Sequence, residues 1–365
     1  MTPLDTVSRS KAETPIPQKR APRKVRVLTT EDWWTLGGSL LSSLALVLVA
    51  YEHILDASGT VGFLFSWYVA FLLIYGCVVA ISNPRNVVVD RLVTVTLYIA
   101  AGLVLFALGT TVVFTFGKGW HAFVHLNFFT HDMSGVSLTA PLNQGGILHA
   151  IVGSLIEVAI AVAVSLPLGI GTAVYMSEVG GRGSRSVRTV VEAMTALPEI
   201  LAGLFVYVTL IVDFGLPKSG LAVSVAMAVT MVPIMARASE VALRVVPNGL
   251  REASSALGAS HWKTVHKVVL PSARAGLATA AILGTARGIG ETAIPLIVSG
   301  ASSFMNFNPV VNPTNSLPLF VYTAYLTGEP PAVARAFGAA SVLLAMVLAL
   351  FVATRVISRN RGASR

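Results

Sequence analysis

Two oppositely charged residues, Arg287 and Glu291, lie four positions apart inside one long apolar stretch of this sequence. On a continuous helix this spacing puts both side chains on one face, one turn apart. Charges inside a bilayer are costly and are usually functional or paired, and the planar fork of an arginine suits two oxygens of a phosphate-like oxyanion. We therefore expect either a polar path for an anion, in which Glu291 holds the guanidinium while the path is empty, or a salt bridge that only fixes helix packing.

The elements that must position this pair are predicted to be membrane spans. Of the 365 residues, 54% are hydrophobic and 12% are charged, which is about half the charged share of a soluble domain. This composition excludes an ordinary soluble enzyme and a disordered chain, and it predicts an all-α polytopic membrane protein. Eight segments are long and apolar enough to span a bilayer: about Trp34–Ile54, Val61–Ser82, Leu92–Phe116, Ile147–Tyr175, Thr189–Val212, Gly220–Ala236, Ala273–Ser299 and Ala332–Val356.

Lysines and arginines predict the orientation of these spans. Of the 26, 22 lie in the two tails and in alternate loops, three (Lys118, Lys218 and Arg335) lie on the opposite side, and Arg287 lies inside a span. The positive-inside rule places the larger group in the cytoplasm, and with it both termini. Membrane topology therefore explains the net charge of +9 better than nucleic-acid binding does. We expect residues 1–32 to be a disordered basic tail and not a signal peptide, because no apolar run directly follows the basic residues.

The sequence contains no pattern typical of a metal or nucleotide site. It has one cysteine, Cys77, and His121, His125 and His131 fit no metal-ligand spacing that we can name. The phosphate-binding pattern GxxxxGK(S/T) is also absent from the sequence. We therefore expect no metal, no cofactor and no enzymatic activity in this chain.

The connection of residues 237–271 is the longest on the predicted cytoplasmic side, and we expect it to contain a short helix. Asn248 is a candidate cap for a helix from Leu250, and Glu252 would fall in its first turn. Gly258 can end that helix in the left-handed conformation, and Pro271 marks the entry to the next span. This helix is either a docking element for a partner or an ordinary interfacial helix without one.

The spacing within this connection resembles the EAA loop of ABC importer permeases. That pattern is Glu-Ala-Ala, three residues, Gly, nine residues, an aliphatic residue, one residue and Leu-Pro. The chain departs from it mildly, with serine for the second alanine and valine for isoleucine. The matching residues are Glu252, Ala253, Ser254, Gly258, Val268, Leu270 and Pro271.

Further motifs resemble the PstA family of phosphate-specific permease subunits, over about Leu92–Ser358. They include Ala286-Arg287-x-x-Gly290-Glu291-Thr292-Ala293, Gly145-Gly146-Ile147, Met176-Ser177-Glu178, Gly203-Leu204-Phe205-Val206-Tyr207 and Leu317-Pro318. Two features depart from that family. The two spans before Leu92 are extra, because such permeases usually have only one span ahead of their five-helix core. Glu199 follows Pro198 where the family tends to have serine. A carboxylate beside an anion path repels the anion unless it is protonated or paired.

The resemblance implies a division of the chain into five parts. These are a cytoplasmic tail (1–32), two additional transmembrane helices (33–91), a further transmembrane helix with an outside loop (92–146), a five-helix ABC permease core containing the coupling loop 237–271 (147–357), and a second cytoplasmic tail (358–365). It places the chain in the inner or plasma membrane, in contact with lipid.

The resemblance also implies the function and the residues that perform it. The chain would form part of the path for inorganic phosphate together with a PstC-like second permease, an ATPase dimer and an extracytoplasmic phosphate-binding protein. The substrate path would contain Arg287, Glu291, Thr292 and Arg237, and the coupling site would contain Glu252, Ala253, Gly258, Leu270 and Pro271. Two alternatives remain open: a permease for molybdate, sulfate or phosphonate, and a membrane scaffold that signals phosphate status.

Overall fold

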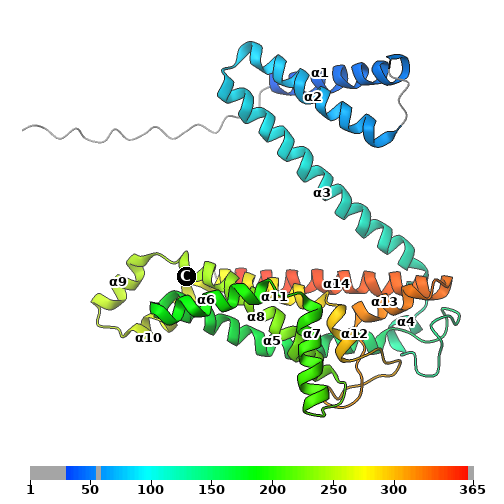
Figure 1. The fold of residues 1–365 in the computed structure, drawn as a ribbon, viewed down its shortest axis with the longest axis vertical. Coiled ribbons are helices and arrows are strands. Elements are labelled where there is room, and N and C mark those ends of the chain that lie inside the picture. Colours follow the sequence, from blue (N-terminus) through cyan, green and yellow to red (C-terminus); the bar gives the residue numbers. More distant parts are fainter. Residues whose placement is uncertain (1–29, 55–58, 361–365) are drawn as a thin grey trace, which may run out of the picture. The chain divides into compact units, whose positions relative to one another are not determined.

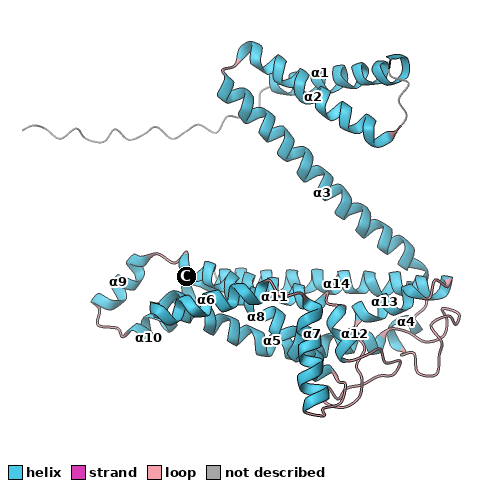
Figure 2. Cartoon of the chain, viewed as in Figure 1, coloured by secondary structure: helices cyan, strands magenta, loops and turns pink. Residues whose placement is uncertain are grey.

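The computed structural model describes residues 30–54 and 59–360, so most of the predicted tail 1–32 and the last five residues lie outside the described part. The described residues are helices joined by loops (Figure 2). The chain divides into two compact units, residues 1–106 and 107–365. The boundary falls inside helix α3 (Arg85–Phe123), which contributes to both units (Figure 1).

The first unit contains α1 (Thr30–Val49), a π-helical turn (Ala50–Ile54), α2 (Thr60–Ser82) and the first part of α3. α1 packs on α2, and the apolar side chains of Phe71, Tyr75 and Val79 are buried. An ion pair of 2.6 Å joins Arg91 Nη2 to Asp32 Oδ1 and ties the start of α3 to the start of α1.

The second unit holds the rest of α3 and the remaining helices. They are α4 (Asn127–Thr130), α5 (Leu148–Val174), α6 (Gly181–Thr195), α7 (Glu199–Val206), α8 (Gly220–Arg244), α9 (Asn248–Ala256), α10 (His261–Thr264), α11 (Leu270–Ile289), α12 (Ala293–Val298), α13 (Leu317–Leu326) and α14 (Pro330–Asn360). Three π-helical turns, Tyr175–Val179, Tyr207–Asp213 and Val265–Val269, extend or precede them.

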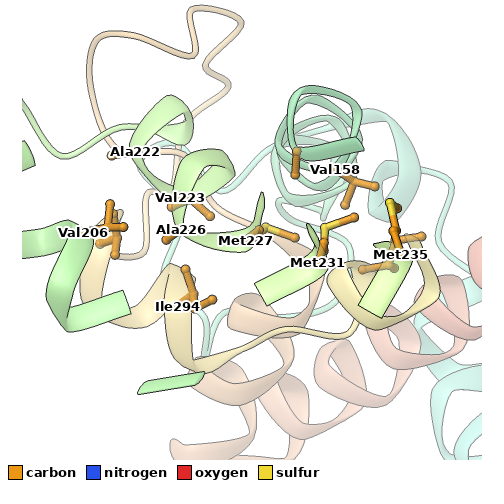
Figure 3. Packing of buried hydrophobic residues seen from close by; sticks show 12 residues of the cluster. Val158, Val206, Ala222, Val223, Ala226, Met227, Met231, Met235 and Ile294 are labelled. Atoms are coloured by element: carbon orange, nitrogen blue, oxygen red, sulfur yellow. The ribbon is translucent and has the colours of Figure 1, made fainter. Parts of the chain in front are cut away.

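Helix α8 is the centre of this unit, and α5, α7 and α11 pack against it. Glycines make the close approach possible: a Cβ at Gly169 of α5 would lie 2.8 Å from Met235 Cβ, and one at Gly288 of α11 would lie 2.7 Å from Met231 Sδ. Small residues at such contacts are typical of helix packing in membranes. Met231 and Met235 belong to a buried apolar cluster that also contains Val158, Val206 and Ile294 (Figure 3).

Among the described residues, seven helices are long and apolar enough to cross a membrane, or eight if the bent pair α6–α7 counts as one span. This confirms the predicted all-helical membrane fold. Two predicted spans are not continuous, however. The fifth, Thr189–Val212, is broken after Thr195 and bent by 101°, because Pro198 cannot donate a helical hydrogen bond. The seventh, Ala273–Ser299, ends its helix at Ile289 and resumes at Ala293.

The α4–α5 loop is held by a buried arginine of α14. Arg335, which is fully buried, donates hydrogen bonds of 2.7–2.8 Å to the carbonyl oxygens of Leu138, Ala140, Pro141 and Gln144. Four backbone acceptors thus bind the two terminal nitrogens of a buried cation without a carboxylate. The guanidinium fixes the shape of this loop.

A carboxylate joins the same loop to the segment after α12. Asp132 accepts hydrogen bonds from the backbone N–H groups of Ser134 and Met305 and from the Ser134 hydroxyl. Burial raises the pKa of this carboxyl, but the three hydrogen bonds and the nearby His149 together lower it by more, so the pKa lies below its ordinary value of 3.8.

Candidate functional site

The charged residue of the seventh span lies where two broken spans meet. Arg287 is in the last turn of α11, and Glu199 is the first residue of α7, directly after Pro198. Arg287 Nη2 forms an ion pair with Glu199 Oε1. The second halves of both broken spans pack on each other, since a Cβ at Gly203 of α7 would lie 3.5 Å from Ile294 of α12. The break before α7, next to Glu199, and the break after α11, near Arg287, therefore lie close together.

The predicted pairing of Arg287 with Glu291 is wrong in its geometry. The helix ends at Ile289, so the two residues do not lie one turn apart on a common helical face. The side chain of Glu291 is buried instead, and its Oε1 accepts a hydrogen bond of 3.1 Å from the backbone N–H of Ala293. Thr292 lies between Glu291 and Ala293 in the sequence and is half-buried at the start of α12. Arg287 pairs with Glu199 instead. Glu199 is the carboxylate that was expected from the sequence to repel an anion in the path unless it was protonated or paired.

An exposed apolar stripe lies along α7 and its flanking residues, on the element that contributes Glu199 to this ion pair. Along α7 the exposed residues recur at helical spacing, whereas Ala202, Gly203 and Val206 on the other side are buried. The side chains of Arg287 and Glu199 are 51% and 27% exposed. A charged pair facing lipid would be costly, so this face requires a protein or water-filled surrounding. The stripe consists of Leu197, Ile200, Leu201, Leu204, Phe205 and Val208.

Arg237, predicted to line the substrate path, belongs to a separate network of charges. It pairs with Glu192 of α6 at 2.7 Å and with Glu240 of α8 at 3.0 Å. The buried carboxylate of Glu240 also accepts from Arg188 at 2.6 Å and from Arg244 at 2.7 Å. Sequence reasoning missed Glu240, although its position at helical spacing from Arg237 and Arg244 was a signal. The network ties α6 to α8 and does not include Arg287 among its described contacts.

The connection between α8 and α11 contains the helix expected there. Helix α9 runs Asn248–Ala256 and is followed by Gly258 at φ +76°, in the left-handed region, which confirms the predicted stop. The predicted start is wrong by two residues. Pro247 occupies the capping position, and the Asn248 side chain accepts from Arg251 Nη1 and does not cap the helix. Glu252 consequently lies beyond the first turn.

The matched coupling residues are accessible on this connection. Glu252, Ala253 and Gly258 are exposed, and Leu250, Leu257 and Trp262 present large apolar side chains that are 44%, 88% and 57% exposed. Leu270 and Pro271 form the first turn of α11, as predicted for the entry to the next span. An exposed apolar surface on a polar connection is typical of a docking site.

One arginine anchors α9 to the rest of the unit. Arg251 donates to both carboxylate oxygens of Glu178 at 2.8 and 3.3 Å, and to the carbonyl oxygens of Val246 and Leu243 at 2.7 and 3.1 Å. Glu178 lies in the π-helical turn that follows α5. Arg251 therefore joins α9 directly to the turn that follows α5.

No group of three or more histidine, cysteine, aspartate or glutamate side chains within residues 30–54 and 59–360 is arranged to hold a metal ion. His125 Nδ1 lies 3.1 Å from the carbonyl oxygen of His121. His131 Nδ1 lies 3.0 Å from the Thr130 hydroxyl. These histidine nitrogens thus have polar partners within the protein.

Comparison with known proteins places this architecture. The family model described as "Binding-protein-dependent transport system inner membrane component" matches residues 165–361, more than half of the chain. "Phosphate transport system permease protein PstA 1" of Mycobacterium tuberculosis (strain CDC 1551 / Oshkosh) is 37% identical over 241 residues, which are 66% of this chain and 79% of that protein. "Phosphate transport system permease protein PstA" of Mycobacterium leprae (strain TN) is 36% identical over 253 residues, or 67% and 83% of the two chains.

A solved structure shows the same fold. A chain in the crystal structure of a bacterial alginate ABC transporter, in complex with its alginate pentasaccharide-bound periplasmic protein, superposes with a TM-score of 0.52 at 15% identity. The match covers 75% of this chain and 98% of that one. Sequence and fold agree: the chain is a multi-pass membrane protein that belongs to the family of binding-protein-dependent transport system inner membrane components, together with the PstA permeases of the two mycobacteria.

Proposed function

We propose that this chain is a permease subunit of an ABC importer and forms one side of the membrane path for inorganic phosphate. The observation that carries the proposal is the position of Arg287, half exposed at the junction of two broken spans on an otherwise apolar face. Broken helices near the middle of the membrane are typical of substrate sites in transporters. The relatives named as phosphate transport permeases support the choice of anion.

The chemistry of the site suits a tetrahedral oxyanion. Arginine keeps its charge inside a membrane protein and can bind two oxygens of one phosphate. Glu291 is turned towards the backbone of Ala293, so it does not occupy the guanidinium of Arg287. Thr292 lies beside the same break and offers a hydroxyl. We propose Arg237 for the cytoplasmic end of the path, where an anion competes with Glu192 and Glu240.

Two surfaces of the chain fit the partners of such a transporter. The exposed stripe of α7 suits a second, PstC-like permease, because a partner there would cover the apolar side chains and enclose the ion pair in a path. The exposed face of α9 and α10 suits the ATPase dimer. The α4–α5 loop, which Arg335 holds in place, suits an extracytoplasmic phosphate-binding protein. The chain itself would hydrolyse nothing. It would transmit the movement of the ATPase, with both termini in the cytoplasm.

Uptake of labelled phosphate by vesicles that contain the complete transporter tests the proposal. Arg287→Gln should abolish uptake while the complex still assembles, and Arg287→Lys should retain little activity because it lacks the planar fork. Arg185→Gln is the matched control, since Arg185 is an exposed arginine of α6 outside the proposed path, and it should transport normally.

The outcomes separate the competing readings. Normal phosphate uptake by Arg287→Gln would contradict the proposed role of this arginine. Sulfate, molybdate or phosphonate that competes better than phosphate would replace the substrate but leave the permease function intact.

A further inference from the structure

Glu199 occupies the position that an anion on Arg287 would need. Its carboxylate pairs with the guanidinium, and no other ion pair of Arg287 occurs within the described part of the chain. Both groups are partly exposed, at 27% and 51% of their side chains. A solute entering between the two side chains therefore meets an arginine that is already neutralised.

The fold holds the two groups together from separate elements. Glu199 lies at the start of α7, where the helix dipole favours a negative charge, and Arg287 lies at the end of α11, where it favours a positive one. The packing of Gly203 against Ile294 joins α7 to α12 close to both breaks. Pro198 fixes the entry of the chain into α7. The carboxylate is consequently tethered beside the guanidinium and is available again whenever the site empties.

We propose that Glu199 is a built-in competitor for Arg287, which lowers the affinity of the path for the transported oxyanion and displaces it from the guanidinium. A tethered group acts at an effective concentration far above that of most free anions. A path must bind its solute tightly enough to admit it and weakly enough to release it. Glu199 makes release possible, because its ion pair with Arg287 re-forms and offsets the interaction that Arg287 loses when the anion leaves. This inference rests on the proposed function, in which Arg287 binds phosphate.

Equilibrium binding of labelled inorganic phosphate to the assembled transporter, purified without the outer binding protein, tests the inference. Glu199→Gln keeps the size of the side chain and removes its charge. It should tighten phosphate binding by about fivefold, the factor that corresponds to an ion pair of about 1 kcal/mol between partly exposed groups. Phosphate uptake should not rise in proportion, because release becomes slower. Glu329→Gln, the same change at an exposed residue directly before α14, should leave binding unchanged.

The outcomes distinguish this inference from the function on which it rests. Arg287→Gln should abolish phosphate binding with or without Glu199→Gln, and binding that survives there overturns the proposed function. Loss of binding in Arg287→Gln, together with unchanged or weaker binding in Glu199→Gln, overturns the competitor role alone. If Glu199→Gln does not assemble, Glu199→Asp serves in its place. Its shorter carboxylate reaches Arg287 less well, so binding should still tighten, and unchanged affinity overturns the inference.

Discussion

Replacing Arg251 with methionine should detach α9 from the end of α5. The arginine makes five hydrogen bonds, two of them to the carboxylate of Glu178, whose side chain is only 4% exposed. Methionine retains much of the apolar stem but donates none of these bonds. The variant therefore leaves a buried carboxylate without its cation, together with two carbonyl oxygens that lose a donor.

The structure sets the size of the effect. Breaking a buried ion pair from one side costs about 3–5 kcal/mol. The side chain of Arg251 is 23% exposed, so water reaches the site in part and the lower end, about 3 kcal/mol, applies. Arg244→Met is the matched control. It also removes an arginine from a buried carboxylate, but Glu240 keeps Arg188 and Arg237, and an arginine that is 59% exposed contributes at most about 1 kcal/mol.

Equilibrium unfolding of the purified permease in mixed micelles gives the free energy of unfolding of each variant. A separate assay in vesicles measures the ATP hydrolysed per phosphate imported. Arg251→Met should be clearly less stable than Arg244→Met and should hydrolyse more ATP per phosphate. Adding Glu178→Gln to Arg251→Met should restore part of the stability, because the uncompensated charge is gone. Equal stability of the two single variants, or no recovery in the double variant, would refute this reasoning.

Two further predictions concern the same connection and the topology. Gly258→Asp places a side chain at φ +76° in open space, so it should cost about 1 kcal/mol through backbone strain and reduce co-purification of the ATPase. Gly249→Ala, also in open space but without a positive φ, should leave both stability and co-purification of the ATPase unchanged. Equal co-purification of the ATPase with the two variants would exclude this connection as the docking element. A reporter inserted within 142–146 should be extracytoplasmic and one within 254–263 cytoplasmic; the reverse pattern would invert the topology.

Local signals in the sequence predicted the features that depend on neighbouring residues. The end of α9 was predicted because Gly258 can adopt a positive φ, and the first turn of α11 because proline fits there. The long apolar helices were predicted from the length and apolar character of particular segments. For α2 the predicted and observed boundaries differ by one residue at the start and agree at Ser82.

Contacts between distant segments could not be predicted in this way. The spacing of Arg287 and Glu291 described a helix that stops before Glu291, and the real partner comes from another broken span. In the sequence Pro198 was considered as the neighbour of Glu199 and not as a break, so the 101° bend at this position was not predicted. Arg335 was counted only among the basic residues on the side opposite the cytoplasm. The four carbonyl groups that surround it belong to the backbone and leave no trace in residue types.

The contact between α8 and α11 pairs flexible side chains of one helix with glycines of the other. Methionines 231 and 235 of α8 face glycines 284 and 288 of α11. A methionine side chain has three rotatable bonds and adapts to a changing gap, whereas a leucine in its place would fit one arrangement. The packing of α11 on α8 therefore relies on side chains that can adjust to a small change in the gap between the helices. Because Arg287 lies in the last turn of α11, the position of its positive charge depends on this same contact between methionines and glycines.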